Sequence, residues 1–186
     1  MDEVKQILED MSELQKYIVL LLNANDNSLI KGNSWFQKEL FLIAKNVPEV
    51  EEEASFDSDM YGPWSENAKE QLDELEMDDV VSKKGKKMWL SELGVKIATE
   101  LIKKVPNDRL VMISEFKVLL NDLNDSELLT LIYFTFPEFT EESLIKDEID
   151  ENRGSTAVKL YRKGKISLQR ASEIAGESLE KFARDI

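Results

Sequence analysis

The side chains that could perform acid–base or nucleophilic chemistry are restricted in this chain. Its 186 residues include no histidine and no cysteine, which excludes Ser-His triads, thiol nucleophiles, ordinary zinc sites and disulfide frameworks. The 7 glycines form no Gly-x-Ser-x-Gly elbow and no nucleotide-binding loop. We therefore expect a protein with no catalytic residues and no cofactor, and not an enzyme.

Carboxylates are the remaining potential metal ligands. Asp57 and Asp59 follow Glu51–Glu53 closely, and carboxylate oxygens are the ligands that Mg²⁺ and Ca²⁺ prefer. The stretch lacks the glycine and the distal glutamate of an EF-hand loop. We interpret residues 49–59 as a solvated acidic loop and expect no metal site.

Four lysines surround one glycine near the middle of the chain. Two apolar runs flank them, Val80-Val81 on one side and Met88-Trp89-Leu90 on the other. This pattern predicts a two-stranded hairpin over residues 80–91 with Gly85 at or beside its tip. The candidate phosphate-binding residues on it are Lys83, Lys84, Lys86 and Lys87.

A turn and a helix precede this hairpin. Gly62-Pro63 forms a corner, and Ser65 is a good N-cap for a helix that ends near Met77. We expect its Leu72 and Leu75 to point inward. This helix is rich in carboxylates, which the phosphates of DNA repel. It is therefore a poor reader of the DNA major groove and better suited to bind a basic protein partner. Its candidate partner-binding residues are Glu66, Glu70, Asp73 and Glu74.

Apolar residues recur at three- and four-residue steps through most of the chain. This periodicity predicts helices, the fourth of them capped by Ser91. They cover residues 3–23, 33–47, 65–77, 92–104, 108–123 and 126–136. A charged segment, residues 139–153, then links the last of these helices to the C-terminal part.

The C-terminal part predicts three short helices, over residues 156–162, 168–175 and 179–186. Gly164 and Gly176 separate them, and serines precede the second and third. Small Ala171, Ala175 and Gly176 would let two helices cross closely. We expect Leu168, Ile174, Leu179 and Phe182 to fill the space between the helices.

The charge of the chain is uneven. A net charge of −14 argues against a protein that coats nucleic acid indiscriminately. Residues 83–104 nevertheless carry 7 lysines against 2 glutamates, and residues 153–186 carry 8 basic against 4 acidic residues. The candidate phosphate contacts of the second region are Arg170, Lys181 and Arg184. Docking on the acidic main domain and recognition of a protein partner are the alternatives for that region.

Two sets of short motifs resemble known families. Gln37-Lys38 with Phe41-Leu42, the Tyr61–Ser65 corner and the Leu90–Gly94 helix start resemble the winged-helix family of the Panacea or SocA-like antitoxin type, over residues 30–104. Residues 160–168 and 171–176 are similar to a small prokaryotic antitoxin family with a helix-turn-helix. Together these similarities cover about 110 residues and imply a prokaryotic regulator that acts through DNA, a toxin partner, or both.

These observations predict a mainly α-helical protein: a winged helix-turn-helix with one small β-hairpin, additional helices and a C-terminal trihelical helix-turn-helix-like segment. The expected parts are a winged-helix unit at 1–105, a helical connector at 106–152 and a basic segment at 153–186. The expected function is a DNA-binding transcriptional regulator of antitoxin type. The alternative is a non-enzymatic protein-interaction module that neutralises a toxin or acts as an adaptor.

The expected location is the cytoplasm, with no membrane partner. The longest uninterrupted apolar stretch, Ile18–Leu22, is too short to span a bilayer. The acidic start at Met1–Glu3 lacks the positive charge of a signal peptide. A homodimer is an open alternative for the assembly.

Overall fold

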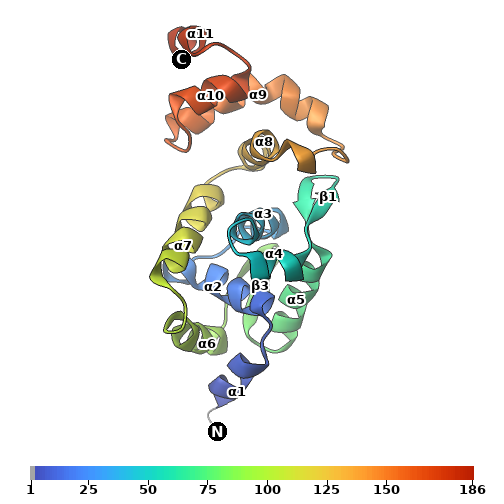
Figure 1. Ribbon diagram of the computed structural model, residues 1–186, viewed down its shortest axis with the longest axis vertical. Helices are drawn as coiled ribbons and strands as arrows, with labels where there is room; N and C mark the ends of the chain where they lie inside the picture. Colours follow the sequence, from blue (N-terminus) through green and yellow to red (C-terminus); the bar gives the residue numbers. More distant parts are fainter. Residues whose placement is uncertain (1–2) are drawn as a thin grey trace. The chain divides into compact units, whose positions relative to one another are not determined.

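The computed structural model describes residues 3–186, which form eleven α-helices, one short 3-10 helix and two two-stranded sheets (Figure 1). The prediction of a mainly helical protein with a small β-hairpin is confirmed. The chain divides into two compact units: residues 3–57 with 64–121, and residues 58–63 with 122–186. Residues 106–121 thus belong to the first unit, and residue 152 lies inside a helix of the second.

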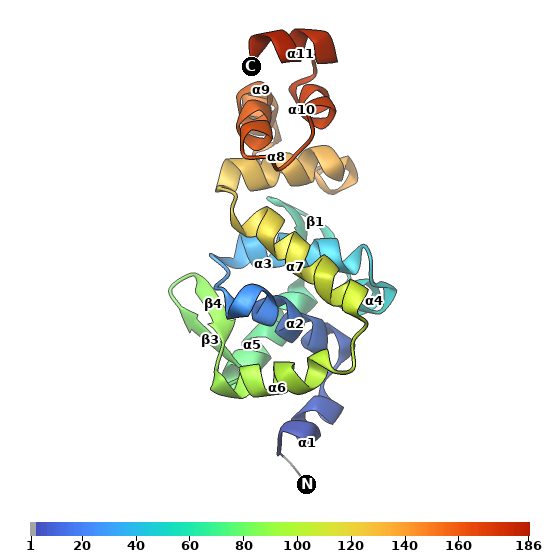
Figure 2. The same cartoon turned by 90° about the vertical axis from the view of Figure 1, so that its left-hand side faces the viewer.

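The first unit is built around one apolar helix. α2 (Glu13–Asn27) buries the whole run Ile18–Leu22, and it contacts most of the other elements of the unit (Figure 2). The elements of this unit are α1 (Glu3–Asp10), α2, α3 (Asn33–Ala44), α4 (Pro48–Ala54), α5 (Glu66–Met77), β3 (Val81–Lys84), β4 (Lys87–Leu90), α6 (Glu92–Ile102) and α7 (Asn107–Asn121). Burial of this apolar run removes it from water and so stabilises the unit.

The predicted helix over residues 3–23 is wrong in one respect, because it is two helices. Ser12 begins α2 with a capping box: its Oγ accepts a hydrogen bond from Gln15 N, and Gln15 Oε1 accepts one from Ser12 N. This reciprocal pair satisfies backbone donors that a continuous helix would satisfy internally. Apolar periodicity continues across the break and hides it. The predicted end at residues 23–27 holds, since Ala24, Asn25 and Asp26 leave helical geometry.

The acidic loop predicted for residues 49–59 is also wrong. Pro48 begins α4, where its fixed φ and missing N–H suit a first helical position. Glu49 and Glu51 lie in the first turn and interact favourably with the helix dipole. The end of the predicted loop forms β1 (Asp57–Asp59), which pairs with β2 (Gly62–Trp64). We did not predict this second small sheet from the sequence.

The predicted hairpin over residues 80–91 is confirmed. β3 and β4 pair antiparallel, with Val81 opposite Leu90, Ser82 opposite Trp89, Lys83 opposite Met88, and Lys84 opposite Lys87. Gly85 lies at the tip with a φ of 62°, which glycine adopts readily. Figure 2 shows the hairpin projecting beside α5 and α6.

The second unit contains α8 (Asp125–Thr135), a 3-10 turn at Pro137–Phe139, α9 (Lys146–Arg162), α10 (Leu168–Ala175) and α11 (Leu179–Asp185). The charged linker predicted for residues 139–153 is wrong, because α9 begins at Lys146 and runs for 17 residues. Gly164 and Gly176 adopt positive φ after α9 and α10, as expected for residues that follow a helix end. Ala157, Ala171, Ile174 and Phe182 form the core of the three C-terminal helices. Leu179 is 46% exposed, so its predicted inward position is wrong.

Candidate functional site

The β3–β4 hairpin has two faces of different character. Side chains alternate along a strand, so Val81, Met88 and Leu90 point into the core and are buried. Lys83 shares that inward face because it lies opposite Met88. Lys84, Lys87 and the half-buried Trp89 belong to the outward face. The four predicted phosphate-binding lysines therefore do not act as one set.

Lys83 is bound by the acidic helix α5. Its Nζ lies 2.6 Å from Asp73 Oδ1 and 2.8 Å from Glu76 Oε2. Partial burial lowers the pKa of Lys83, but the bonds from these two carboxylates outweigh it and leave the pKa raised. The hydrogen bond from Lys83 lowers the pKa of Asp73 below its ordinary value. A predicted nucleic-acid-binding residue and a predicted partner-binding residue thus pair with each other.

The outward lysines have no such partners. Lys84, Lys86 and Lys87 are exposed, and within residues 3–186 none of the three forms an ion pair. Lys84 and Lys87 stand directly opposite each other in the ladder, where like charges destabilise a strand pair. A concentrated positive charge therefore sits on a protein whose net charge is −14.

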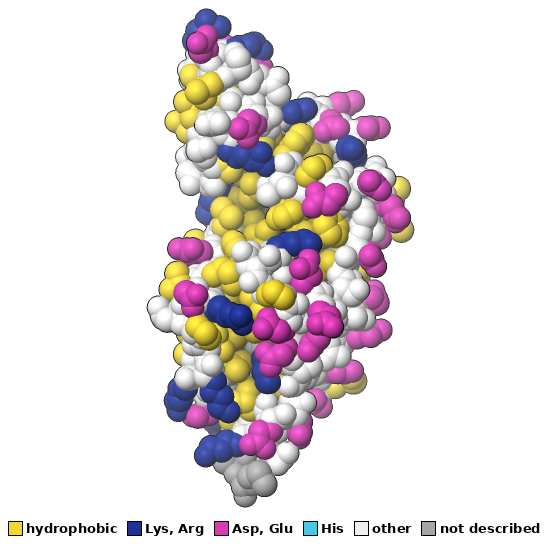
Figure 3. All heavy atoms as spheres, viewed as in Figure 1, with side chains coloured by type: hydrophobic (Ala, Val, Ile, Leu, Met, Phe, Trp, Pro, Cys, Tyr) yellow, Lys and Arg dark blue, Asp and Glu magenta, His cyan; other side chains and the backbone are white. Residues whose placement is uncertain are grey.

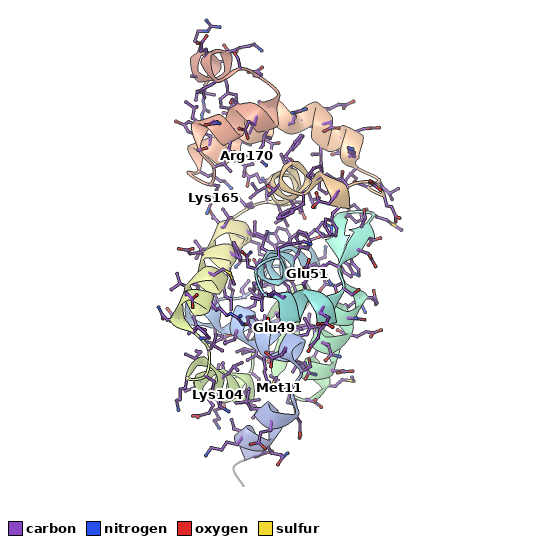
Figure 4. The ribbon with its side chains drawn as sticks, viewed as in Figure 1. Met11, Glu49, Glu51, Lys104, Lys165 and Arg170 are labelled. Carbon is purple, nitrogen blue, oxygen red and sulfur yellow. The ribbon has the colours of Figure 1, made fainter. Side chains whose placement is uncertain are left out.

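α5 presents a row of carboxylates. Ser65 caps it through a bond from Ala68 N to Ser65 Oγ, and Leu72 and Leu75 are buried as predicted. Glu66, Glu70 and Glu74 recur every four residues and are exposed. In the view of Figure 3, acidic side chains gather on the side of α4 and α5, and Figure 4 labels Glu49 and Glu51 of α4.

One hydrogen-bonded clamp fixes the start of α5. Gln37 Nε2 donates to Ser65 O and Gln37 Oε1 accepts from Ser65 N, each at 2.9 Å. Ser65 Oγ also donates to Ala54 O. The glutamine of the first resemblance motif and the serine of the second are thus direct partners that orient the helix. The sequence showed the two motifs separately, but it did not show that Gln37 and Ser65 are hydrogen-bonded to each other.

The third resemblance motif explains how α6 packs. Ser91 caps α6 through Gly94 N. A Cβ at Gly94 would lie 2.2 Å from Val80 O and 3.1 Å from Leu90 Cβ. Only glycine lets α6 approach the start of β3 this closely. Gly94 therefore allows α6 to pack directly against the base of the hairpin.

The C-terminal segment uses most of its predicted phosphate contacts internally. Arg170 donates to Phe134 O at 2.6 Å and pairs with Glu173 at 3.1 Å; it is labelled in Figure 4. Lys181 pairs with Glu177 at 2.5 Å, which raises the pKa of Lys181. Arg184 is exposed. Of the three residues, Arg184 is therefore the one whose charged group is most available to a phosphate.

Sequence reasoning missed the burial of three ionisable residues of the first unit, Lys38, Glu39 and Lys117. Glu39 on α3 is fully buried, and its carboxylate oxygens have no hydrogen-bond partner within residues 3–186. Burial raises its pKa well above the ordinary value, against the smaller opposing effects of Lys117 and Lys31. Lys117 on α7 donates to Leu22 O and Ala24 O, both at 2.8 Å. Burial lowers the pKa of Lys117 to about 8, and Glu39 opposes this shift. The signal in the sequence that could have predicted this burial is a charged residue among the apolar positions of a helix.

Serine and lysine recur at a spacing that some hydrolases use. Four Ser-x-x-Lys spacings occur: Ser28–Lys31, Ser114–Lys117, Ser143–Lys146 and Ser178–Lys181. Ser114 Oγ donates to Asn25 Oδ1, Lys117 Nζ donates to two backbone carbonyls, and Ser143 Oγ bonds with the hydroxyl of Tyr133. Lys31 lies over the ring of Trp35 at 5.2 Å, and Ser178 caps α11 while Lys181 pairs with Glu177. The described part of the chain contains no cluster of three or more acidic residues arranged to hold a metal.

Comparison of the chain with protein-family models, with curated proteins and with solved structures finds no match. Within residues 3–186, none of the helices has the length and apolar character needed to cross a membrane.

Proposed function

We propose that this protein is a non-enzymatic, DNA-binding regulator of antitoxin type whose first unit is a winged helix-turn-helix. The order of elements supports this assignment. α5 is followed directly by the β3–β4 hairpin and then by α6, and Ile30, between α2 and α3, adds a bridge to the hairpin through two bonds with Met88, 2.9 and 3.0 Å long. The hairpin then occupies the position of a wing and α5 that of a recognition helix. The resemblance in the Gln37, Tyr61–Ser65 and Leu90–Gly94 motifs points to the same family.

The observation that carries the proposal is the outward face of the hairpin. Lys84, Lys86 and Lys87 are exposed without counter-charges in the described chain, although the protein has 38 carboxylates. The Lys84–Lys87 repulsion costs stability, and a polyanion would relieve it. DNA phosphates supply such an anion, and each contact releases condensed counterions.

The acidic face of α5 limits how the DNA is bound. Glu66, Glu70 and Glu74 would be repelled by phosphates in a major groove. Contacts between hairpin lysines and DNA phosphates position a protein on the DNA backbone but do not distinguish one base sequence from another. The proposed regulator therefore binds DNA with modest affinity and depends on a second surface or a partner for specificity.

A charge-matched pair of triple variants tests the proposal. The variant K84A/K86A/K87A should flatten the slope of log affinity against log salt by about 2 to 3, because each lysine that no longer neutralises a phosphate changes the slope by near one unit. The control K5A/K104A/K146A changes net charge equally at exposed positions outside the hairpin and should flatten the slope much less. Equal slopes for the two variants would reject the hairpin as the DNA-binding surface.

The carboxylate row of α5 favours a second candidate, capture of a basic protein partner such as a toxin. Three exposed carboxylates spaced one helical turn apart complement a positive patch and would speed association at low salt. The variant E66K/E70K should abolish capture of such a partner and tighten nonspecific DNA binding. The control E141K/E142K, also exposed, should leave partner capture unchanged. Unchanged partner capture in E66K/E70K would reject α5 as the partner-binding surface, and loss of DNA binding would contradict the stated repulsion between α5 and DNA.

A further inference from the structure

The first unit contains a pocket that neither candidate function uses. Its volume is about 480 Å³, within the range of small-molecule sites. It lies between the end of α2, α6 and α7. The lining residues are Leu20, Asn23, Ala24, Asn25, Asp26, Asn27, Val95, Ile102, Leu110, Ile113 and Ser114.

One wall of the pocket is an uncommon stretch of backbone. Asn25, Asp26 and Asn27 have consecutive positive φ angles of 55°, 56° and 53°. Residues other than glycine adopt this region seldom, and Asn and Asp tolerate it best. Strained backbone persists only where its surroundings determine it, and it concentrates at functional sites.

Three sets of side-chain bonds hold this wall in place. Asn25 and Ser114 bond to each other, with Ser114 Oγ donating to Asn25 Oδ1 at 2.5 Å. Asn27 donates to Leu90 O at 3.0 Å and accepts from Leu90 N at 2.8 Å. Lys117 donates to Leu22 O and Ala24 O from the buried side. The pocket is therefore preformed, and a ligand would not have to order it.

Its chemistry is asymmetric. The floor is aliphatic, from Leu20, Ile102, Leu110 and Ile113, with Val95 partly exposed at the edge. Asp26 is the only charged residue in the lining. The side chain of Asp26 is exposed and that of Asn23 half-buried, and neither side chain has a hydrogen-bond or ion-pair partner within residues 3–186. Because the ammonium of Lys117 is already bonded to backbone carbonyls, the group available to a ligand is a carboxylate beside an apolar surface.

We infer that this pocket binds a small molecule with an aliphatic body and a primary ammonium group. The aliphatic body would cover the floor, and the ammonium group would meet Asp26 and Asn23 at the rim. An ammonium offers three donors to these acceptors, whereas a carboxylate ligand would be repelled by Asp26. Such a ligand would bridge α2, α6 and α7, and the Asn27–Leu90 bonds connect the same wall to β4.

Three probes of equal chain length test the inference: hexylamine, 1-hexanol and hexanoate at neutral pH. Titration is followed by the methyl NMR signals of Val95, Ile102 and Ile113. We expect hexylamine to shift all three signals and to bind up to about fivefold more tightly than hexanol, the upper end for an exposed charge pair. Hexanoate should bind most weakly.

Two variants and one control locate the effect. D26N should reduce hexylamine affinity to that of hexanol and leave hexanol affinity unchanged. V95W should block all three probes, and D150N, at an exposed acid of α9, should change nothing. Equal or tighter binding of hexanoate, no shift of the three methyl signals, or unaltered hexylamine affinity in D26N would overturn the inference.

Discussion

Single residues of the buried core carry the clearest physical cost in this protein. The carboxylate oxygens of Glu39 have no hydrogen-bond partner within the described chain, and Lys117 is fully buried. Burying either charge is expensive unless it is paired. Lys117 recovers part of this cost through two backbone carbonyls, whereas Glu39 does so by remaining protonated to a higher pH than usual.

The variant E39Q should change the pH dependence of stability. The native carboxyl has a raised pKa, so above about pH 4.5, the unfolded value, the native state binds the extra proton. Its contribution to the free energy of unfolding therefore falls as pH rises, by up to about 1.4 kcal/mol per pH unit. Urea unfolding of wild type and E39Q should show E39Q gaining relative stability between pH 5 and pH 7. A constant difference would mean that Glu39 ionises normally; E70Q, at an exposed site, is the control.

The variant K117M should lower the free energy of unfolding by about 2–4 kcal/mol at pH 7. It removes the donor to Leu22 O and Ala24 O and the larger of the two positive charges that act on Glu39. The double variant K117M/E39Q should lose less than the sum of the two single changes, because the residues interact. Strict additivity in urea unfolding would show that they do not, and K96A should stay within about 0.5 kcal/mol of wild type.

At the scale of elements, the contact between α6 and the β3–β4 hairpin depends on one glycine. The variant G94A would place a Cβ 2.2 Å from Val80 O, so helix and strand must separate. We expect a loss of at least about 2 kcal/mol of unfolding free energy. The matched variant G154A lies within α9, where a Cβ meets nothing within 4 Å, and it should gain about 0.5–1 kcal/mol. Thermal unfolding that shows the same sign for both variants would contradict this account.

Elements marked by local chemistry were predictable from the sequence. The hairpin, the Ser65 and Ser91 caps and the glycine stops at Gly164 and Gly176 all follow from side chains close in the chain. Long-range effects were not predictable. The pairing of Lys83 with α5 depends on strand register, which decides the face on which each lysine lies.

Errors arose where two signals conflicted or where a charged composition suggested a loop. Apolar periodicity concealed the break at Ser12, and four acids after Pro48 concealed α4. The bonds of Arg170 to α8 could not be read from its position in a basic segment. The sequence pattern therefore predicted where the hairpin and the acidic helix lie in the chain. It did not predict which of their charged side chains pair with each other and which face solvent.

At the scale of the whole molecule, a net charge of −14 causes self-repulsion that salt screens. Raising NaCl from about 20 to about 200 mM should increase the urea midpoint, because the screening length falls from roughly 20 Å to under 10 Å. The variant E66Q/E70Q/E74Q changes the net charge from −14 to −11 by removing three carboxylates, so its gain should be smaller. A midpoint that falls with salt in both proteins would show that attractive pairs such as Lys83 with Asp73 outweigh the repulsion.

The register of the hairpin also constrains how the chain can change over evolution. Lys83 faces α5 and Lys84 faces solvent because strand side chains alternate. Deleting Ser82 while the pairing at the tip is kept would leave Lys83 opposite Met88 but place Val81 opposite Trp89, on the outward face, so the residues before the deletion would change face. Substitutions and two-residue changes at the tip preserve the alternation. Homologous hairpins are thus expected to differ in length by even numbers of residues, a pattern that a set of related sequences would reveal without any structure.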